Sequence, residues 1–470
     1  MLLSLQIITS IITAGLMCGL AIKLVHVFQL DGYRVNLFAK WCLRNRTRYV
    51  MTLLVLGVLG FGSTAILRLL LLCFNISEVW SYFGLLFFLG LSICTIYLTI
   101  KKPVKVPLKY TKRVIRLLTL TTILSVLLSF VVLKFTAIWM LPFVASVLPF
   151  VLLISAIILC PLEKFIKYTY IRKAKNKLFS NQYKDLIRIG IAGSYGKTTC
   201  KSILAQMLEQ KYKTVASPAS YNTPMGFVKT VLENLQPGTE VLIMEMGERY
   251  QNDIKEMCNL VKPHHGIVTH IGKAHLDTLG SVENVERCVM ELVNSIPENG
   301  VKVIGNDRDN FDICAEMALA LGITHDQIEK VRKELKPVPH RLEIIENENG
   351  VKIIDDSYNS NPDGAILALG KLAELKTSKA VIMTPGMVEL GDYQYDENKT
   401  FAENMGKVAD EIIIVGEENK KSLLDGLKNI EYNKENIHCV PDVESAKKLF
   451  PKLLNRGDVL LIENDLPDNF

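Results

Sequence analysis

Long apolar runs fill the first third of this chain, and they restrict its possible folds more than any other feature. Residues 1–160 hold these runs, broken by short basic stretches, whereas residues 179–470 have an ordinary content of charged residues. A hydrocarbon core about 30 Å thick is crossed by roughly 20 apolar residues in an α-helix. The pattern predicts five membrane-spanning helices, near residues 3–29, 49–74, 81–100, 117–134 and 137–160.

Lysine and arginine residues gather after the first, third and fifth predicted helices, and the other two loops carry almost none. Loops rich in these residues stay on the cytoplasmic side of a membrane, so the N-terminus is predicted outside and the C-terminal part inside. Residues 161–178 form a basic linker in this scheme. Membrane lipid is the expected partner of the basic stretches, which account for most of the net charge of +6. Because they do not alternate with aromatic residues, no nucleic-acid binding is expected.

A glycine-rich turn between an apolar strand, 186–192, and a helix, 197–210, is the clearest functional motif. Its glycines let backbone N–H groups converge on an anion, its lysine brings a charge to the β- and γ-phosphates, and its first threonine offers a hydroxyl to Mg²⁺. The alternative is a glycine-rich turn that binds no ligand, but such a turn would have little structural need for the sequence Lys-Thr-Thr at the start of the helix. The predicted nucleotide-binding residues of this turn are Gly193, Ser194, Tyr195, Gly196, Lys197, Thr198 and Thr199.

Two more side chains follow predicted strands of the same sheet. Glu245 ends strand 239–245, and His275 comes a few residues after strand 265–271. Ligands bind at the carboxyl ends of parallel strands, where a carboxylate can hold Mg²⁺ and a histidine can hold a metal or a phosphate. A surface glutamate and a structural histidine are the alternatives that the residues alone leave open.

Strands and helices alternate from residue 186 to residue 463, which predicts two α/β domains with mostly parallel sheets. The central domain is expected at 179–336 and the C-terminal domain at 337–470. The expected fold is therefore multi-domain: an N-terminal α-helical transmembrane domain over 1–178, an α/β P-loop central domain and an α/β Rossmann-like C-terminal domain. In the C-terminal domain, strands are predicted at 340–346, 351–356, 379–384, 411–415 and 458–463, and helices at 362–374, 397–407, 419–428 and 442–453.

The chain resembles the Mur ligase family, most of all its branch that adds D-alanyl-D-alanine to a muramoyl tripeptide. The resemblance spans roughly residues 186–463 and implies ATP-dependent formation of an amide bond through an acyl-phosphate. The motifs that carry it, in the order and approximate spacing of the family, are GSYGKTT, YNTPMG, IMEMG, VTHIGKAHLDTLGS, PVPHRLE and IDDSYNSNPDG.

The resemblance also implies roles for single residues and names ATP and Mg²⁺ as cofactors. Lys197 would hold the β- and γ-phosphates, and Thr198 and Glu245 would hold one Mg²⁺. His275 would hold a second Mg²⁺. Arg341 would reach the γ-phosphate from the C-terminal domain, and Asp356 would contact the nucleotide. The implied catalytic residues are Lys197, Glu245, His275 and Arg341.

The chain departs from the family pattern in three places. Where the family has a lysine that is carbamylated to bind the second metal, Val289 offers no ligand atom. Residues 306–310 run almost directly into a predicted helix at 313–321, so part of the central domain is expected to be absent. The C-terminal sequence LLIENDLPDNF lacks the Lys-Gly-Ser-type motif of the D-alanyl-D-alanine-adding enzymes, which points to a different incoming amine.

These features predict a membrane-anchored, ATP-dependent ligase that acts on a cell-wall precursor or another envelope intermediate at the cytoplasmic face. Its expected substrates are a small-molecule or lipid-linked carboxylate and an amine, and cell-wall synthesis proteins are further candidate partners. The alternative is a nucleotide-binding membrane scaffold or regulator of cell-wall synthesis with weakened ligation, which Val289 and the short central domain favour. An ATP-driven transporter is not expected, because the spans lack paired charges.

Overall fold

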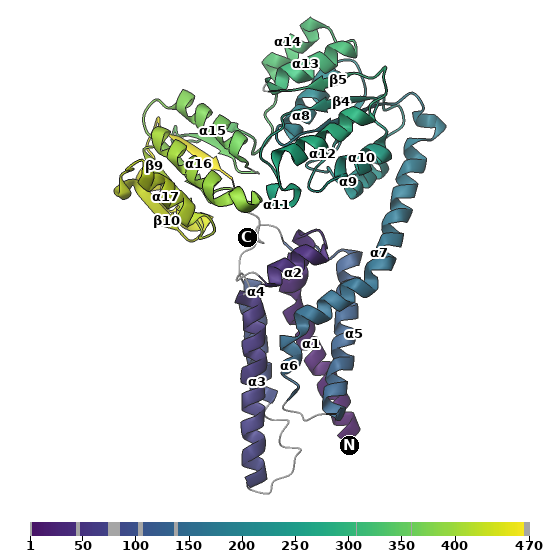
Figure 1. Cartoon of the computed structure of the whole chain (residues 1–470), viewed down its shortest axis with the longest axis vertical. Coiled ribbons are helices and arrows are strands. Elements are labelled where there is room, and N and C mark those ends of the chain that lie inside the picture. The colour runs from purple at the N-terminus through teal and green to yellow at the C-terminus, as the bar shows by residue number, and fades with distance from the viewer. Residues whose placement is uncertain are drawn as a thin grey trace. The chain divides into compact units, whose positions relative to one another are not determined.

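The computed structural model describes residues 2–43, 48–73, 85–101, 107–135, 140–306, 308–358 and 360–464 (Figure 1). The described chain divides into two compact units, which adjoin in the sequence between Ile166 and Lys167. The first unit is helical. The second unit holds two α/β domains, each built around its own sheet.

The N-terminal unit consists of helices with apolar sequences. Four of the described helices are long and apolar enough to cross a membrane, over Gln6–Leu30, Tyr49–Cys73, Lys112–Phe135 and Leu148–Leu178. A fifth apolar helix, Leu85–Lys101, has 17 residues. The helices that begin in this unit are α1 (Leu2–Leu30), α2 (Val35–Leu43), α3 (Arg48–Cys73), α4 (Leu85–Lys101), α5 (Lys112–Phe135), α6 (Phe143–Ser146) and α7 (Leu148–Leu178).

The predicted limits of the fifth span, 137–160, were wrong. The described part of that stretch holds the short helix α6 and the start of α7, because the backbone leaves the helical conformation at Val147, with φ −94° and ψ 0°. Helix α7 then continues through the predicted basic linker to Leu178, since the lysines and leucines there, with Arg172 and Ala174, are good helix formers. The predicted third span begins at 81–84, outside the described residues.

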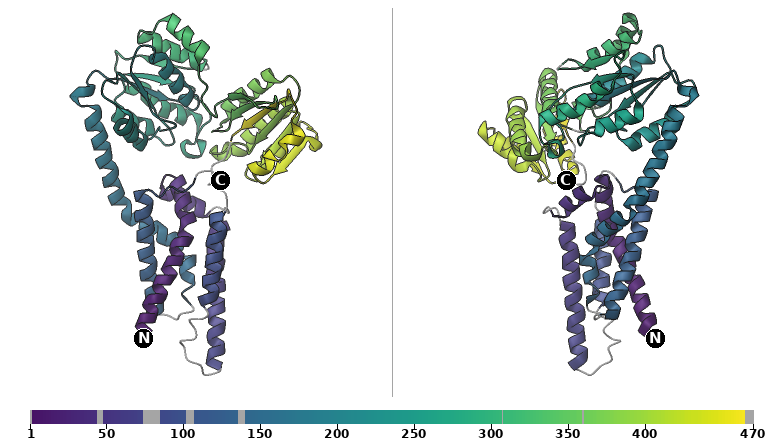
Figure 2. Two further views of the ribbon diagram at one scale, coloured as in Figure 1. Left: turned by 180° about the vertical axis from the view of Figure 1, so that it is seen from behind. Right: turned by 45° about the vertical axis from the view of Figure 1, so that its right-hand side comes forward.

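The domain expected as the central domain, called the middle domain from here on, has a five-stranded parallel sheet in the order β2-β3-β1-β4-β5. Apolar residues from α9, α10 and α12 fill the core on one face, and those from α8, α13 and α14 fill it on the other (Figure 2). Register places Ile191 of β1 beside Glu245 of β3, so the phosphate loop and this glutamate share the carboxyl edge of the sheet. The strands are β1 (Ile187–Ala192), β2 (Thr214–Ala216), β3 (Val241–Glu245), β4 (His265–Val268) and β5 (Lys302–Ile304).

Helices connect these strands. Strand β2 and helices α9 and α10 were not predicted. Between β5 and the next strand, the described residues form two helices and no strand. The helices are α8 (Lys197–Leu208), α9 (Pro224–Lys229), α10 (Asp253–Val261), α11 (Leu276–Leu279), α12 (Val282–Ser295), α13 (Asn310–Ala320) and α14 (His325–Glu334), with a π-helical turn, η4 (Thr230–Asn234), after α9.

The C-terminal domain has a six-stranded sheet in the order β10-β9-β8-β11-β7-β6, in which β6 alone is antiparallel to its neighbour. This architecture confirms the predicted α/β class of both domains. The strands are β6 (Glu343–Glu346), β7 (Lys352–Asp356), β8 (Ala380–Thr384), β9 (Glu411–Val415), β10 (Ile437–Val440) and β11 (Val459–Glu463).

Three helices pack on one face of this sheet and two short ones on the other. The predicted helix 442–453 was wrong, because the chain forms two short helices instead. Pro451, in the first turn of the second, lacks the N–H that a continuous helix needs. The helices are α15 (Pro362–Leu375), α16 (Gln394–Val408), α17 (Lys420–Asn429), α18 (Val443–Lys447) and α19 (Phe450–Leu453), with 3-10 turns η5 (Gly391–Tyr393) and η6 (Lys434–Asn436).

Candidate functional site

The backbone of the phosphate loop requires glycine at two positions. Gly193 has φ +140°, and a Cβ there would lie 2.2 Å from the Thr269 hydroxyl. Gly196 has φ +80° and precedes the first turn of α8. The Ser194 N–H donates to the carbonyl of His270 at 2.7 Å, which ties the loop to the segment after β4. The loop therefore has its bent shape before any ligand binds.

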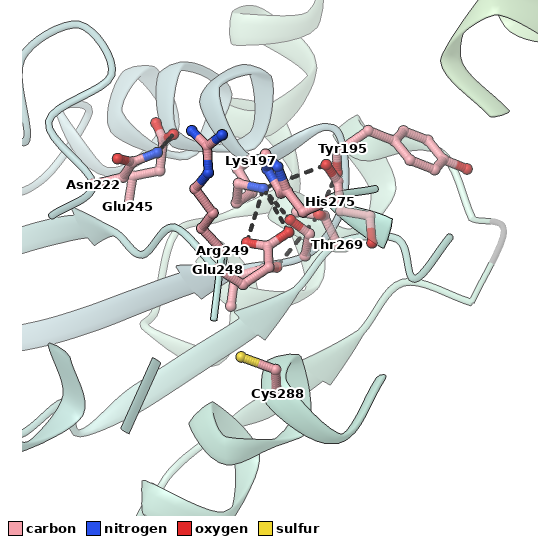
Figure 3. Close-up of polar contacts among 12 residues, drawn as sticks. Tyr195, Lys197, Asn222, Glu245, Glu248, Arg249, Thr269, His275 and Cys288 are labelled. Carbon is pink, nitrogen blue, oxygen red and sulfur yellow. Dashed lines mark hydrogen bonds and ion pairs between the residues drawn. The ribbon is translucent and has the colours of Figure 1, made fainter. Parts of the chain in front are cut away.

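Tyr195 fixes the same turn from its outer side. Its ring stacks on the His270 imidazole, with centroids 4.5 Å apart and planes 4° from parallel. The Thr269 hydroxyl donates to the Tyr195 carbonyl at 2.5 Å (Figure 3). In this structure Tyr195 supports the loop, while Thr199 lies in the first turn of α8.

Lys197 is held at the loop by a glutamate that the sequence analysis missed. Its Nζ donates to both carboxylate oxygens of Glu248 at 3.1 Å and also contacts the Gly193 carbonyl (Figure 3). The Glu248 side chain is fully buried, and that of Lys197 is 12% exposed. A buried carboxylate thus faces the charge that is predicted to bind phosphate.

A second ion pair lies beside the first. The Thr198 hydroxyl donates to Oε2 of Glu245 at 3.0 Å, and Nζ of Lys201 lies 2.8 Å from the same oxygen. Both charged side chains of this pair are buried. Lys201 was also missed, although it follows Lys197 by four residues and therefore lies on the same face of α8. Hydroxyl and carboxylate oxygens are the ligands that Mg²⁺ prefers, so Thr198 and Glu245 fit a magnesium site.

His275 lies at the start of α11 with φ 51°, and its contacts come from both domains. Its Nδ1 is 2.8 Å from Oε2 of Glu389, a residue of the loop after β8 that was not predicted. Oε1 of Glu389 lies 2.8 Å from Nη2 of Arg249. Burial raises the pKa of Glu389, but the hydrogen bond from His275 and the charges of His275 and Arg249 outweigh it, so this pKa is below its ordinary value.

Arg341 and Asp356 lie together at the start of the C-terminal domain. The Arg341 guanidinium lies 4.4 Å from the centroid of the Tyr358 ring. Burial lowers the pKa of Arg341, and the charges of Asp356 and of Glu245 in the middle domain act against this. Asp356 accepts a hydrogen bond from the Leu342 N–H at 3.1 Å, and burial raises its pKa to about 6.

Val289 lies on α12 inside the apolar core of the middle domain. Its side chain is fully buried and belongs to the same cluster as Met246 and Leu292. The position therefore contributes packing, and it brings no ligand atom to the site.

The site as a whole balances two cations against two carboxylates at the start of α8. Loop N–H groups and the positive end of the helix dipole favour an anion there. The arrangement can hold a phosphate chain with a divalent cation beside it.

Comparison with known sequences identifies both domains. The profile of the Mur ligase middle domain matches residues 191–355, and that of the Mur ligase, glutamate ligase domain matches residues 340–463. A UDP-N-acetylmuramoyl-tripeptide–D-alanyl-D-alanine ligase of Mycobacterium tuberculosis (strain ATCC 25618 / H37Rv) is 27% identical over 271 residues, or 43% of this chain. The match spans 53% of that relative, about half of its length. The enzyme of the same name from Bacillus subtilis (strain 168) is 24% identical over 336 residues, covering 58% of this chain and 72% of the relative.

Solved structures show the same fold. MurF from Acinetobacter baumannii has a TM-score of 0.55 at 20% identity, covering 63% of this chain and 77% of that one. MurF ligase from Thermotoga maritima in complex with ADP has a TM-score of 0.55 at 21% identity, covering 64% of this chain and 80% of that one. The chain therefore belongs to the Mur ligase family, through its middle and C-terminal domains.

Proposed function

We propose that this protein is a membrane-anchored ligase that uses ATP and Mg²⁺ to form an amide bond on a cell-wall or other envelope precursor. The observation that carries the proposal is the arrangement of Lys197, Thr198 and Glu245 at the start of α8. The names of the relatives support a carboxylate on a muramoyl peptide as the acceptor.

The chain's residues would serve phosphoryl transfer first. Loop N–H groups and Lys197 would bind the β- and γ-phosphates, and Thr198 and Glu245 would hold Mg²⁺, whose charge would neutralise part of that on the phosphates. An oxygen of the acceptor carboxylate attacks the γ-phosphorus, and the bond to the β-phosphate oxygen breaks to release ADP. Arg341 stabilises the charge that spreads over the phosphoryl oxygens during this step.

The amide forms in the second step. The nitrogen of the amine attacks the carbonyl carbon of the acyl-phosphate, inorganic phosphate leaves, and the amine gives up a proton. His275 is proposed to hold a second cation near the phosphoryl group. Asp356 is proposed to contact the nucleotide from the C-terminal domain.

The proposal includes anchoring through residues 1–178, with the ligase domains at 179–336 and 337–470 in the cytoplasm. Four long apolar helices and the basic stretches between them support it. A reporter enzyme fused after Phe470 is expected to be active only in its cytoplasmic form. Activity of a form that works outside the membrane would overturn both this topology and access to ATP.

Phosphate release by the full chain in detergent tests the ligase function. We expect release that depends on ATP, on one muramoyl peptide and on one amine of a panel of amino acids and dipeptides. The panel includes amines other than D-alanyl-D-alanine. Nucleotide binding without any release would favour the scaffold or regulator, the candidate that Val289 supports.

A further inference from the structure

The carboxylate of Glu248 is an unusual group to find beside a phosphate loop. It is fully buried, and its hydrogen bonds within the described structure come from Nζ of Lys197, at 3.1 Å to each oxygen. The two oxygens of Glu248 offer about four lone-pair sites in total, and their partner is a single ammonium group, that of Lys197. A buried charge needs a partner, and the partner of Glu248 in the described structure is Lys197.

The loop that carries Glu248 contacts helix α12 and the turn that begins with His275. The Cys288 thiol on α12 donates to the Tyr250 carbonyl at 3.4 Å. Burial raises the pKa of this thiol to about 12, and the charge of Glu248 contributes to the shift. On the other side, the Thr278 hydroxyl donates to the Arg249 carbonyl at 2.5 Å, in the turn that begins with His275. The loop that follows Glu248 is therefore held to α12 on one side and to the His275 turn on the other.

Nucleotide binding changes the charge balance at this position. Lys197 is the loop's cation for the β- and γ-phosphates, and those phosphates bring several negative charges next to it. A buried carboxylate facing them is repelled and has lost much of its compensation. A divalent cation between Glu248 and the phosphates removes this cost, because Mg²⁺ binds carboxylate and phosphate oxygens together.

We propose that Glu248 is a ligand of the second divalent cation, acting with His275 in place of the modified lysine that the family pattern would put at Val289. The inference rests on the proposed function. Val289 packs in the same apolar cluster as Met246, two residues before Glu248. In this chain the metal ligand would therefore come from the loop after β3, through Glu248, and not from α12. A glutamate carboxylate binds metal directly, so it needs no carbamylation.

Counting bound metal tests this directly. The full chain in detergent is titrated with Mn²⁺ in the presence of the non-hydrolysable analogue AMPPNP, and free Mn²⁺ is followed by its electron paramagnetic resonance signal. We expect two Mn²⁺ per wild-type chain and one for Glu248→Gln, whose amide keeps the shape but loses the charge. The affinity of the Glu248→Gln variant for AMPPNP should be at least tenfold lower than that of the wild type at the same free Mn²⁺ concentration. Glu256→Gln is the control, because Glu256 also pairs with a lysine, Lys167, but is 48% exposed.

Other results would overturn the inference in distinguishable ways. A single Mn²⁺ in the wild type, with nucleotide bound, leaves the proposed function and refutes the second site. Two Mn²⁺ in both proteins show that another group is the ligand. Tighter AMPPNP binding by Glu248→Gln with an unchanged metal count means that Glu248 only restrains Lys197. A wild type that binds no nucleotide refutes the proposed function and this inference together.

A reciprocal pair of variants guards against a misfolded Glu248→Gln. Glu248→Ala is expected to bind one Mn²⁺, and Glu248→Ala with Val289→Lys should regain the second only when bicarbonate is supplied. Bicarbonate allows carbamylation of the new lysine and gives the wild type no change. Regain without bicarbonate, or none at all in a folded double variant, contradicts the exchange of ligands between the two positions.

Discussion

The carboxyl edges of the two sheets differ in how they balance buried charge. In the middle domain, Lys197 pairs with Glu248 at 3.1 Å and Lys201 pairs with Glu245 at 2.8 Å. Each buried carboxylate there has its own lysine. This pairing offsets the cost of burying the charge of each carboxylate.

The C-terminal sheet ends in carboxyls with less compensation. Asp356 of β7 and Glu463 of β11 are neighbours in register. Burial raises the pKa of Glu463 well above its ordinary value, and the charge of Asp356 raises it further. Ser360 donates a hydrogen bond to Oε1 of Glu463, but Oε2 has no partner among the described residues. The pKa values of the carboxyls at this edge of the C-terminal sheet are thus raised by burial, whereas each buried carboxylate at the edge of the middle-domain sheet has a lysine partner.

The carboxyl edge of the middle-domain sheet, where each buried carboxylate pairs with a lysine, is called the paired edge below. The largest effect is expected from removing one of its lysines. Lys201→Met leaves Glu245 buried without its cation, which should lower the free energy of unfolding by about 3–5 kcal/mol. Lys420→Met is the matched control, since its partner Glu417 is 78% exposed, and it should lower the free energy of unfolding far less than Lys201→Met does. Chemical denaturation of the full chain in detergent measures both. Equal losses would show that the paired edge does not depend on compensation.

Nucleotide affinity gives the next effect. Lys197→Ala removes a charge-assisted contact to phosphate and should weaken binding of Mg·ATP by about 1.5–3 kcal/mol. Isothermal titration of the full chain checks the affinity. Because the variant also leaves Glu248 unpaired, Lys197→Ala with Glu248→Gln separates the loss of the contact from the loss of stability. Unchanged affinity in a folded variant would remove Lys197 from the site.

The sequence predicted the paired edge only in part. Gly193 and Gly196 were identifiable because the loop geometry is local, and Glu245 because a strand ends there. Glu248 and Glu389 were not, since the loops that carry them are placed by packing on α12 and by contact between domains. Arg341 and Asp356 followed from family motifs, as neither has a local pattern of its own. The end of the fifth span was misjudged because α7 continues beyond its apolar part.

The stability of the C-terminal domain should respond to pH through Asp356 and Glu463, at the carboxyl edge of its sheet. Raised pKa values mean that folded Glu463 and Asp356 keep protons that the unfolded chain releases, so their contribution to stability falls as pH rises above the ordinary carboxyl range. For Asp356 the window ends near its pKa of about 6. Glu463→Gln should become more stable relative to the wild type as pH rises, measured by chemical denaturation at several pH values. A constant difference would contradict the raised pKa.

The contact between the two domains gives the smallest expected effect. Glu389→Gln keeps the backbone carbonyl that accepts from the Asp277 N–H at 3.2 Å, but it weakens the charged contacts to His275 and Arg249. These groups are partly exposed, so the loss should be about 1 kcal/mol or less. Hydrogen exchange of the α11 amides should then quicken by less than about tenfold.

The acid response of this contact has the opposite sign to that of Glu463. Because the folded pKa of Glu389 is lowered, its stabilising contribution is present above its ordinary pKa and is lost as pH falls through the lowered value. Wild-type protection of α11 should therefore decline at acid pH, after correction for intrinsic exchange, and that of Glu389→Gln should not. The stabilising contributions of Glu463 and Asp356 in the C-terminal domain would then be lost as pH rises. The contribution of Glu389, at the contact between the two domains, would be lost as pH falls. Equal decline in both proteins would assign the acid response to another group and leave Glu389 a neutral packing contact.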